Sequence, residues 1–452
     1  MSGVLWGELE LRRIAETALR HATGDQADAL VRASAVDLTR FANNAIHQNV
    51  ASREARLQVR VVKGRRVGMI TTNDIGEDGI ARAARSASDL AGHVPENPDF
   101  AGLPAARPLP PASSAFVDRT AGTTPLQRAR MVAALCGRAR ERGLVAAGYV
   151  STSAHEIAVA STHGVWAYAP STLAAVETVV MGDAGSAWAE RNAVDVGRID
   201  MDGVTAEAIE KCVAAQAPRD LAPGQYEVVL EPYAVSDIAG FLAGSLTGSA
   251  IEDGRSFVGG KLGQKVTGPV TFVDDPFDPE CGPRAFDYEG QPSQRITLIE
   301  DGVARAVVYD HQTAARTGNA NTGHALPPNP FLPAAPQHLR IEPGGSSRED
   351  LIRSVDRGVL VTRFHYTRWV HQLRTIVTGM TRDGTFLIEK GEIAHPVKNF
   401  RFTQSYHEAL GGTLAIGRDL HLFATAEFGF GGARRVPAMR LASFTFTGAT
   451  QY

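Results

Sequence analysis

This chain contains little cysteine, no long apolar run and no large excess of charge of one sign. The three cysteines, Cys136, Cys212 and Cys281, lie far apart. An odd and sparse set argues against a disulfide framework and favours a reducing compartment. No stretch approaches the roughly 18–20 uninterrupted apolar residues of a membrane span, and the first residues lack the basic and apolar regions of a signal peptide. We therefore expect a cytoplasmic protein.

The charges of the chain are almost balanced. Its 46 lysines and arginines are interspersed with 49 acidic residues, which leaves a formal net charge of −3. Such a chain has no overall basic field to attract nucleic acid or an anionic membrane, so we expect neither as a partner. With 452 residues, 44% of them hydrophobic, the chain is long enough for two or three globular domains.

The first half of the chain alternates helical and strand-like patterns. Apolar residues at helical spacing predict helices over residues 8–22, 75–91, 124–142 and 204–216. Alternating segments lie between them, with turn signals at Asn43-Asn44, at Lys63-Gly64-Arg65 and at residues 161–164. The order helix, strands, helix, strands suggests two related α+β halves.

A proline- and alanine-rich stretch at 217–224 marks the predicted domain boundary. We expect an N-terminal α/β domain over residues 1–220 and a β-rich, sheet- or barrel-like domain over 221–452, an α+β fold overall. Helices are predicted at 234–250 and 347–357 of the second domain. Its predicted strands are the short apolar runs at 226–231, 269–275, 295–302, 304–310, 339–344, 358–364, 385–393 and 443–448.

The obvious motifs of hydrolytic chemistry are incomplete. A zinc hydrolase needs imidazole ligands on one face of an element together with a carboxylate. The pairs His155-Glu156 and His407-Glu408 are followed by no second ligand four or five residues later. No serine lies in a G-x-S-x-G motif, and no cysteine has the neighbours of an activated nucleophile. The Gly-rich run at 428–432 is expected to be a mobile loop, with close approach of another backbone as the alternative.

The segment from His365 to His371 is the most suggestive polar stretch. On a straight strand the two histidines share a face but lie about 20 Å apart, which precludes a shared metal unless the chain folds back. The segment is therefore open to three interpretations: a metal site, a polar and aromatic wall of a substrate cleft, or a surface loop. His324, His365, Arg368 and His371 are the candidate cleft residues.

Several ordered blocks of the chain resemble the TldD/TldE family, whose TldE members are also called PmbA or modulators of DNA gyrase. The blocks are TRFANNAIHQN and VRVVKGRRVGMITTN in the first half, then GRSFVGGKLGQKV, VTFVDDP, FDYEGQPSQRITLIEDGV, YDHQTAARTGNANTGHA, RGVLVTRF, TGMTRDGTFLIEKGEI and ALGGTLAIGRDL. The resemblance implies two domains and a dimer that encloses a cavity. It also implies that TldD members are zinc peptidases with a His-Glu-x-x-x-His helix and a later cysteine ligand. The resemblance further implies that TldE members lack these ligands and pair with TldD members.

The chain departs from the zinc-binding pattern. If Glu231 stands at the first histidine position, Ser236 stands at the last, and no cysteine follows Cys281. By resemblance the chain is TldE-like, with Glu231 and Ser236 as degenerate ligand positions, no metal or catalytic residue of its own, and zinc expected in a partner subunit.

This pattern predicts a subunit of a zinc peptidase complex that acts on unfolded or modified peptides. The subunit would be non-catalytic, would complete the chamber and its peptide cleft, and would pair with a TldD-like, zinc-bearing subunit or with a second copy of itself. Two alternatives are a homodimeric peptide-binding scaffold without a peptidase partner, and a divergent metallopeptidase that uses His324, His365 or His371.

Overall fold

A computed structural model of the chain describes residues 5–328, 332–424 and 432–449, so most of the Gly-rich run at 428–432 lies outside it. The first half forms a six-stranded sheet in the order β3-β2-β1-β4-β5-β6, in which each strand pairs antiparallel with its neighbours. Its elements are α1 (Glu8–His21), β1 (Gln26–Ala42), β2 (Ala45–Lys63), β3 (Arg66–Thr72), α2 (Glu77–His93), α3 (Asp118–Ala121), α4 (Pro125–Glu141), β4 (Val145–Ser161), β5 (Trp166–Met181), β6 (Ser186–Ala193), η1 (Val196–Arg198) and α5 (Met201–Ala214).

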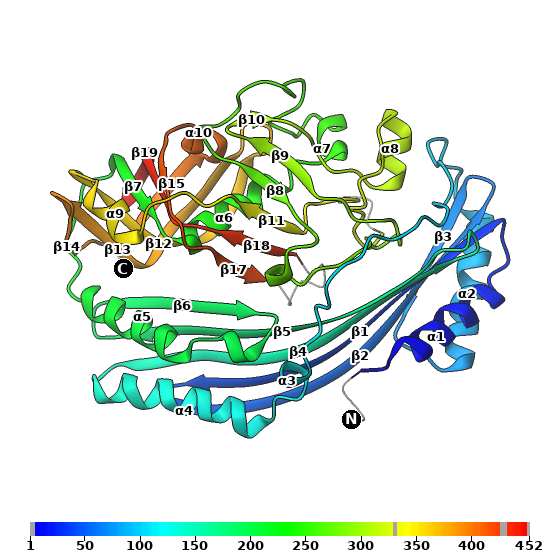
Figure 1. Cartoon of the computed structure of the whole chain (residues 1–452), viewed down its shortest axis with the longest axis horizontal. Helices are drawn as coiled ribbons and strands as arrows, with labels where there is room; N and C mark the ends of the chain where they lie inside the picture. Colours follow the sequence, from blue (N-terminus) through cyan, green and yellow to red (C-terminus); the bar gives the residue numbers. More distant parts are fainter. Residues whose placement is uncertain (1–4, 329–331, 425–431, 450–452) are drawn as a thin grey trace.

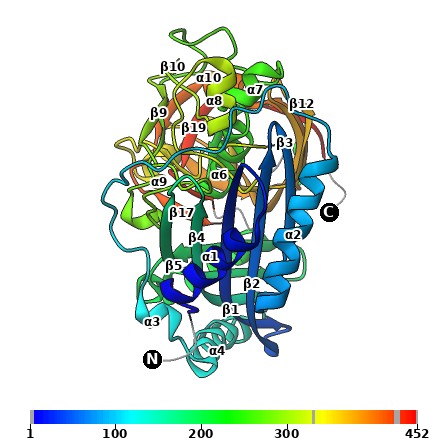
Figure 2. The same cartoon turned by 90° about the vertical axis from the view of Figure 1, so that its right-hand side faces the viewer.

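Two similar halves build this sheet, as the order of the predicted elements suggested. A helix, three antiparallel strands and a second helix occur first as α1 to α2 and again as α4 to α5. The central strands β1 and β4 join the halves. The helices lie on one side of the curved sheet, and the C-terminal part of the chain lies over the other side (Figures 1 and 2). One face of the sheet is therefore available to form a site with the C-terminal part.

The turns of the sheet fall where the sequence predicted them. Asn43 and Asn44 connect β1 to β2 with φ angles of 52° and 58°, and Gly64 connects β2 to β3 with φ 61°. Left-handed backbone is tolerated best by glycine and asparagine, which explains these residues at these turns. Helix α4 begins at Pro125 after a capping box between Thr124 and Gln127.

The C-terminal half contains a closed sheet, so the prediction of a β-rich, barrel-like domain is confirmed. The ring runs β12-β7-β19-β15-β13, and β12 pairs with β13 to close it. A second sheet has the order β10-β9-β8-β11-β18-β17. The ring strands are β7 (Gly224–Leu230), β12 (Arg357–His371), β13 (Ile376–Glu389), β15 (Phe400–Ser405) and β19 (Met439–Ala449), with β14 (Glu392–Pro396) and β16 (Thr413–Ile416) paired to them.

Helix α6 (Pro232–Ala243) follows the first ring strand and belongs to the main apolar core. Residues such as Val235, Ile238 and Leu242 are fully buried in one cluster with the strands of both C-terminal sheets. The remaining elements are α7 (Gly248–Glu252), β8 (Phe272–Asp274), η2 (Pro279–Cys281), β9 (Ile296–Glu300), β10 (Val303–Ala304), α8 (His311–Thr317), β11 (His338–Ile341), α9 (Arg348–Arg353), α10 (Tyr406–Gly411), β17 (His421–Ala424) and β18 (Ala433–Val436).

Three predicted elements of this half were wrong in extent. The helix expected at 234–250 is two helices, because the chain turns after Gly244 and Thr247 caps α7. The strand expected at 304–310 ends at Ala304, and Asp310 instead caps α8 through the amides of Gln312 and Thr313. The helix expected at 347–357 ends at Arg353, since β12 begins at Arg357.

Two further properties bear on the sequence predictions. Cys136, Cys212 and Cys281 are buried and unpaired. Across the described ranges, every helix is too short or too polar to cross a membrane.

Polar and apolar contacts join the two halves of the chain. Leu30 and Val159 of the N-terminal sheet share an apolar cluster with Phe286 and Leu326. Next to it, the buried Arg60 on β2 pairs with Asp28 and reaches Glu289 of the C-terminal half, with 3.3 Å between Nη2 and Oε1. Burial raises the pKa of Glu289 to about 7, and nearby acidic groups add to this effect while Arg60 opposes it.

Replacing Glu289 with glutamine should make stability less dependent on pH between about 4.5 and 7. Because its pKa is higher in the folded state than the ordinary value of 4.5, Glu289 stabilises the fold at low pH and loses that contribution as pH rises through about 7. We expect the stability of Glu289→Gln relative to the native protein to increase across this range by up to about 3 kcal/mol.

Thermal denaturation at several pH values measures this change. Glu96→Gln is the control, because the side chain of Glu96 is 60% exposed. Identical pH profiles for native protein and Glu289→Gln would contradict the prediction.

Candidate functional site along helix α6

A groove of about 540 Å³ lies beside α6. The helix contributes residues spaced three and four apart, which places them on one face of the helix. Arg434 from β18 and Trp369 from β12 line the groove from other elements. The lining residues from α6 and its C-cap are Ser236, Asp237, Gly240, Phe241 and Gly244.

A buried charge network holds the beginning of α6. Glu231 precedes the first residue of the helix and is 2% exposed. Its Oε2 accepts a hydrogen bond from Lys211 Nζ at 2.5 Å, and its Oε1 accepts one from Arg348 Nη2 at 2.7 Å. These two cations outweigh the effect of burial and lower the pKa of Glu231 to about 2. The carboxylate is thus ionised and fully engaged.

The network continues into the N-terminal half through α5. Lys211 also contacts Glu207 one helical turn earlier, with 3.1 Å between Nζ and Oε1. Glu207 in turn accepts hydrogen bonds from Arg191 on β6, at 2.7 Å, and from the Tyr233 hydroxyl on α6, at 2.9 Å. The charges therefore connect β6, α5, α6 and α9 across the two halves of the chain.

A guanidinium lies against the groove face of α6. Arg434 Nε donates to Ser236 Oγ at 3.0 Å. A Cβ atom at Gly240 would lie 3.1 Å from Arg434 Nη1, so glycine at this position leaves the space that the guanidinium occupies. Within the described ranges no carboxylate lies within 4.0 Å of Arg434, although burial lowers its pKa. Arg434 is therefore a partly desolvated cation beside an open groove.

Asp237 and two aromatic side chains form another part of the groove wall. The Tyr406 hydroxyl donates to Asp237 Oδ1 at 2.7 Å, and Thr367 Oγ1 donates to Oδ2 at 2.8 Å. Burial raises the pKa of Asp237. Trp369 meets Phe241 edge to face, with 4.9 Å between ring centroids. The groove thus combines hydrogen-bonding groups and an apolar surface, which suits an extended peptide.

The candidate cleft residues predicted from the sequence lie outside the α6 groove. His365, Arg368 and His371 are absent from the lining of this groove and from that of a second cavity between the two halves. Tyr366 has φ 55°, and the β12–β13 register shifts between His365 and Arg368. This bulge directs Thr367 and Trp369 toward α6. Arg368 instead stacks on Tyr366, 4.1 Å from the ring centroid.

His324 is a buried residue rather than a groove residue. Its Nε2 lies 2.9 Å from Asp274 Oδ2, and its Nδ1 lies 2.8 Å from the carbonyl oxygen of Thr322. Sequence reasoning missed Arg434, Asp237 and Phe241 as groove residues. A signal was present in Ser236, Gly240 and Gly244, because small residues four apart form a helix face that another group can approach closely.

The residues at the degenerate ligand positions do not fit a divalent cation. Both oxygens of Glu231 are bound to cationic side chains, and the Ser236 hydroxyl accepts from the Arg434 guanidinium. Zinc sites use imidazole, thiolate or free carboxylate ligands, and a metal ion here would meet fixed positive charge. In the part of the chain that the structure describes, no group of three or more histidine, cysteine, aspartate or glutamate residues is placed to bind a metal.

This architecture is that of the PmbA/TldD class of proteins. The structure of TldE from Thermococcus kodakarensis matches the fold with a TM-score of 0.88, over 97% of this chain and 100% of that chain, at 19% identity. Residues 223–448 match the PmbA/TldA metallopeptidase C-terminal domain, and residues 27–91 match PmbA/TldA metallopeptidase domain 1. The chain belongs to the PmbA/TldD metallopeptidase family, which confirms the resemblance inferred from the sequence blocks.

Several relatives carry metalloprotease names. Metalloprotease PmbA from Escherichia coli O157:H7 is 22% identical over 408 residues, 86% of each chain. A metalloprotease from Methanothermobacter thermautotrophicus is 27% identical over 234 residues, so the match spans half the length of both chains.

Replacing Glu231 with glutamine should destabilise the protein by about 3 kcal/mol, because Lys211 and Arg348 would lose the charge that compensates them. Because the pKa of Glu231 is lower in the folded state than its ordinary value, its negative charge stabilises the fold fully above about pH 4.5. This stabilisation is lost as pH falls through about 2. The difference between native protein and Glu231→Gln should therefore shrink as pH falls through this range.

Chemical denaturation at several pH values tests both points. Glu300→Gln is the matched control, because Glu300 pairs with Arg305 at the surface with 58% and 49% exposed side chains and should change stability by less than about 0.5 kcal/mol. Equal stability of Glu231→Gln and Glu300→Gln would show that the buried network is not needed.

Proposed function

We propose that this chain is a TldE/PmbA-type subunit of a peptidase assembly, which supplies a peptide-binding groove and leaves hydrolysis to a zinc-bearing, TldD-type partner. The observation that carries the proposal is the state of the two degenerate ligand positions. The negative charge of Glu231 is compensated by Lys211 and Arg348, and the Ser236 hydroxyl accepts a hydrogen bond from Arg434. A fixed guanidinium can hold a peptide but cannot activate water as a metal ion does.

The groove beside α6 supports a peptide as the ligand. Arg434 has donor groups beyond the one used on Ser236, and these can bind a main-chain carbonyl oxygen. Trp369 and Phe241 offer apolar surface for a side chain. Binding through the main chain together with a non-specific apolar wall tolerates many sequences, which suits unfolded or modified peptides.

The assembly would be a heterodimer with the zinc-bearing subunit, with a homodimer as the form of the isolated chain. The buried, unpaired cysteines favour the cytoplasm as its compartment. A peptide-binding homodimer without a peptidase partner has no separate observation in its favour.

Metal content and cleavage test this proposal directly. The purified chain should bind less than stoichiometric zinc and cleave no unstructured peptide, whereas mixing it with a His-Glu-x-x-x-His partner should give chelator-sensitive cleavage above that of the partner alone. The control is the same mixture with the glutamate of the partner's motif replaced by glutamine. Stoichiometric zinc together with chelator-sensitive cleavage by the isolated chain would reject the proposal.

Arg434→Met should weaken binding of an unstructured peptide by about tenfold or more, because it removes a partly desolvated hydrogen-bonding cation while keeping a similar side-chain volume. Calorimetric titration of the full chain measures the affinity, and a melting curve verifies folding. Arg305→Met, at an exposed surface pair, is the matched control and should bind like the native chain. Unchanged affinity in Arg434→Met would remove Arg434 from the groove's function.

A further inference from the structure

The hairpin between β12 and β13 borders the α6 groove. Trp369 and Gln372 of this hairpin belong to the groove lining, and Thr367 donates a hydrogen bond to Asp237 on α6. Because successive side chains of a strand point to opposite sides, the residues next to Thr367 and Trp369 face away from α6. The hairpin therefore has an inner side on the groove and an outer side away from it.

The outer side and the turn of this hairpin form an exposed surface that combines apolar and cationic groups. Three of its members are large apolar side chains that are between 47% and 63% exposed. The other members are two arginines and a histidine, which are also exposed. We call this surface the hairpin tip, and its residues are Tyr366, Arg368, Val370, His371, Leu373 and Arg374.

The fixed charges in this part of the chain have one sign. Residues 357–382 contain five arginines and no aspartate or glutamate. The buried Asp383 compensates Arg363. Among the residues that the structure describes, no carboxylate lies within 4.0 Å of Arg368 or Arg374. The hairpin tip therefore carries two positive charges without an acidic partner at the edge of the groove.

The helix next to the turn does not cancel this charge. His407 on α10 lies beside the end of the turn, with 2.8 Å between its Nδ1 and Thr375 Oγ1. Glu408 and Lys261 lie near His407, and their opposite charges offset each other. The charge at the hairpin tip is therefore set by its own arginines.

Tyr366 and Arg368 are ordered before any ligand binds. The φ angle of 55° at Tyr366 is unfavourable for an aromatic residue and belongs to the bulge in β12. Arg368 stacks on the exposed ring, with 4.1 Å between its Cζ and the ring centroid. A guanidinium that is already held in place loses less conformational entropy when it binds a carboxylate.

The composition and size of the hairpin tip select an acidic peptide as its ligand. A second copy related by a two-fold axis would place this basic surface against itself, which like charges oppose. The surface is also much smaller than the roughly 20–30 residues per side of a stable subunit interface. Arg368 covers one face of Tyr366, which leaves less of the ring for stacking of nucleic-acid bases. An extended peptide that leaves the groove over the turn fits both the place and the charge.

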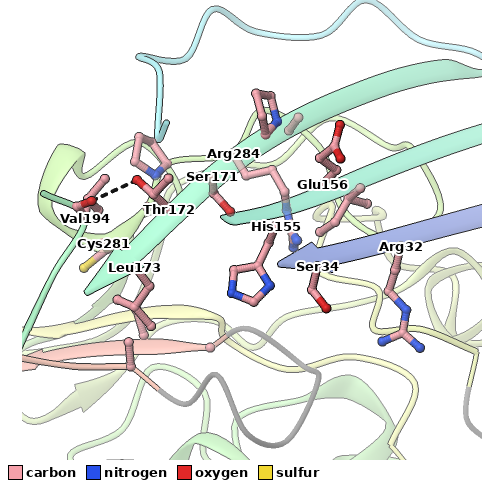
Figure 3. Close-up of a pocket in the computed structure, with 18 of the residues that line it drawn as sticks. Arg32, Ser34, His155, Glu156, Ser171, Thr172, Leu173, Val194, Cys281 and Arg284 are labelled. Carbon is pink, nitrogen blue, oxygen red and sulfur yellow. Dashed lines mark hydrogen bonds between the residues drawn. The ribbon is translucent and has the colours of Figure 1, made fainter. Parts of the chain in front are cut away.

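The larger cavity between the two halves of the chain lies apart from this surface. It has a volume of about 650 Å³, and Figure 3 shows Ser34 and His155 of its lining on the same side of the strands, whereas Glu156 points away. Its described lining residues include none of the hairpin tip and none of the α6 groove. Of these two cavities, the hairpin tip therefore adjoins only the groove.

We propose that the hairpin tip binds acidic side chains of an extended peptide, through Arg368 and Arg374, on one side of the segment that lies in the α6 groove. Val370 and Leu373 supply apolar surface for neighbouring side chains of the same peptide. The presence of a peptide in the groove rests on the proposed function. The groove then tolerates many sequences, while the hairpin tip selects those with acidic flanks.

Fluorescence anisotropy of the full chain with two labelled peptides tests the proposal. Both contain the core Ala-Leu-Ala-Leu-Ala and blocked termini. The acidic probe has Asp-Glu-Asp at each end of the core, and the neutral probe has Asn-Gln-Asn. We expect the acidic probe to bind about fivefold tighter at low salt, because exposed ion pairs each contribute modestly. The ratio should fall below about twofold in 1 M salt, where charges are screened beyond about 3 Å.

Variants then locate the preference. Arg368→Gln combined with Arg374→Gln should reduce the ratio of the two affinities to below about twofold, because both charges of the hairpin tip are removed. Arg82→Gln is the matched control and should keep the full ratio, since Arg82 is a 62% exposed residue on α2 in the N-terminal half. Melting curves verify that these surface variants fold.

Three results would overturn the proposal. The first is equal binding of the two probes, or no binding of either. The second is a ratio of affinities that the double variant leaves unchanged. The third is a single-stranded oligo(dT) probe that binds the native chain more tightly than the acidic peptide and loses this binding in the double variant, because the hairpin tip would then be a nucleic-acid site.

The two proposals can fail separately. An acidic preference that the double variant loses, combined with an assembly that cleaves no peptide, would reject the proposed function and leave the role of the hairpin tip. Cleavage by the assembly, combined with equal binding of the two probes, would reject the role of the hairpin tip and leave the proposed function.

Discussion

The buried carboxylate of Glu231 is the interaction on which the arrangement of the two halves depends. It binds Lys211 from α5 and Arg348 from α9, and Lys211 continues through Glu207 to Arg191 on β6. Charges removed from water are costly unless they are paired with good geometry, so this network favours the arrangement in which β6, α5, α6 and α9 meet. The same network sets the start of α6, and with it the position of the groove face.

The groove face of α6 carries a guanidinium beside Ser236, one of the two ligand positions inferred from the sequence resemblance. In the zinc-binding pattern implied by the sequence resemblance, the last ligand stands where this chain has Ser236. Here the hydroxyl of Ser236 receives a guanidinium, and Gly240 leaves room for it. A guanidinium binds and orients oxygen atoms, but it supplies no open coordination position for water. This difference is the basis of the function proposed above.

Strand β18 contributes one residue to each of two cavities. Ala433 belongs to the lining of the cavity between the two halves of the chain and Arg434 to that of the α6 groove. Successive side chains on a strand point to opposite sides, so one short strand contributes to two separate cavities.

The sequence by itself determined the local elements and the family. Periodicity identified the N-terminal helices, and Asn43, Asn44 and Gly64 identified turns, because helix and turn preferences depend on a few neighbouring residues. Only the tertiary structure decided which polar residues form sites. Arg434 meets Ser236 across 198 positions of sequence, and the bulge at Tyr366 turned Trp369, rather than the predicted histidines, toward α6. Such pairings depend on strand register and on the burial of charge, which no local pattern in one sequence specifies.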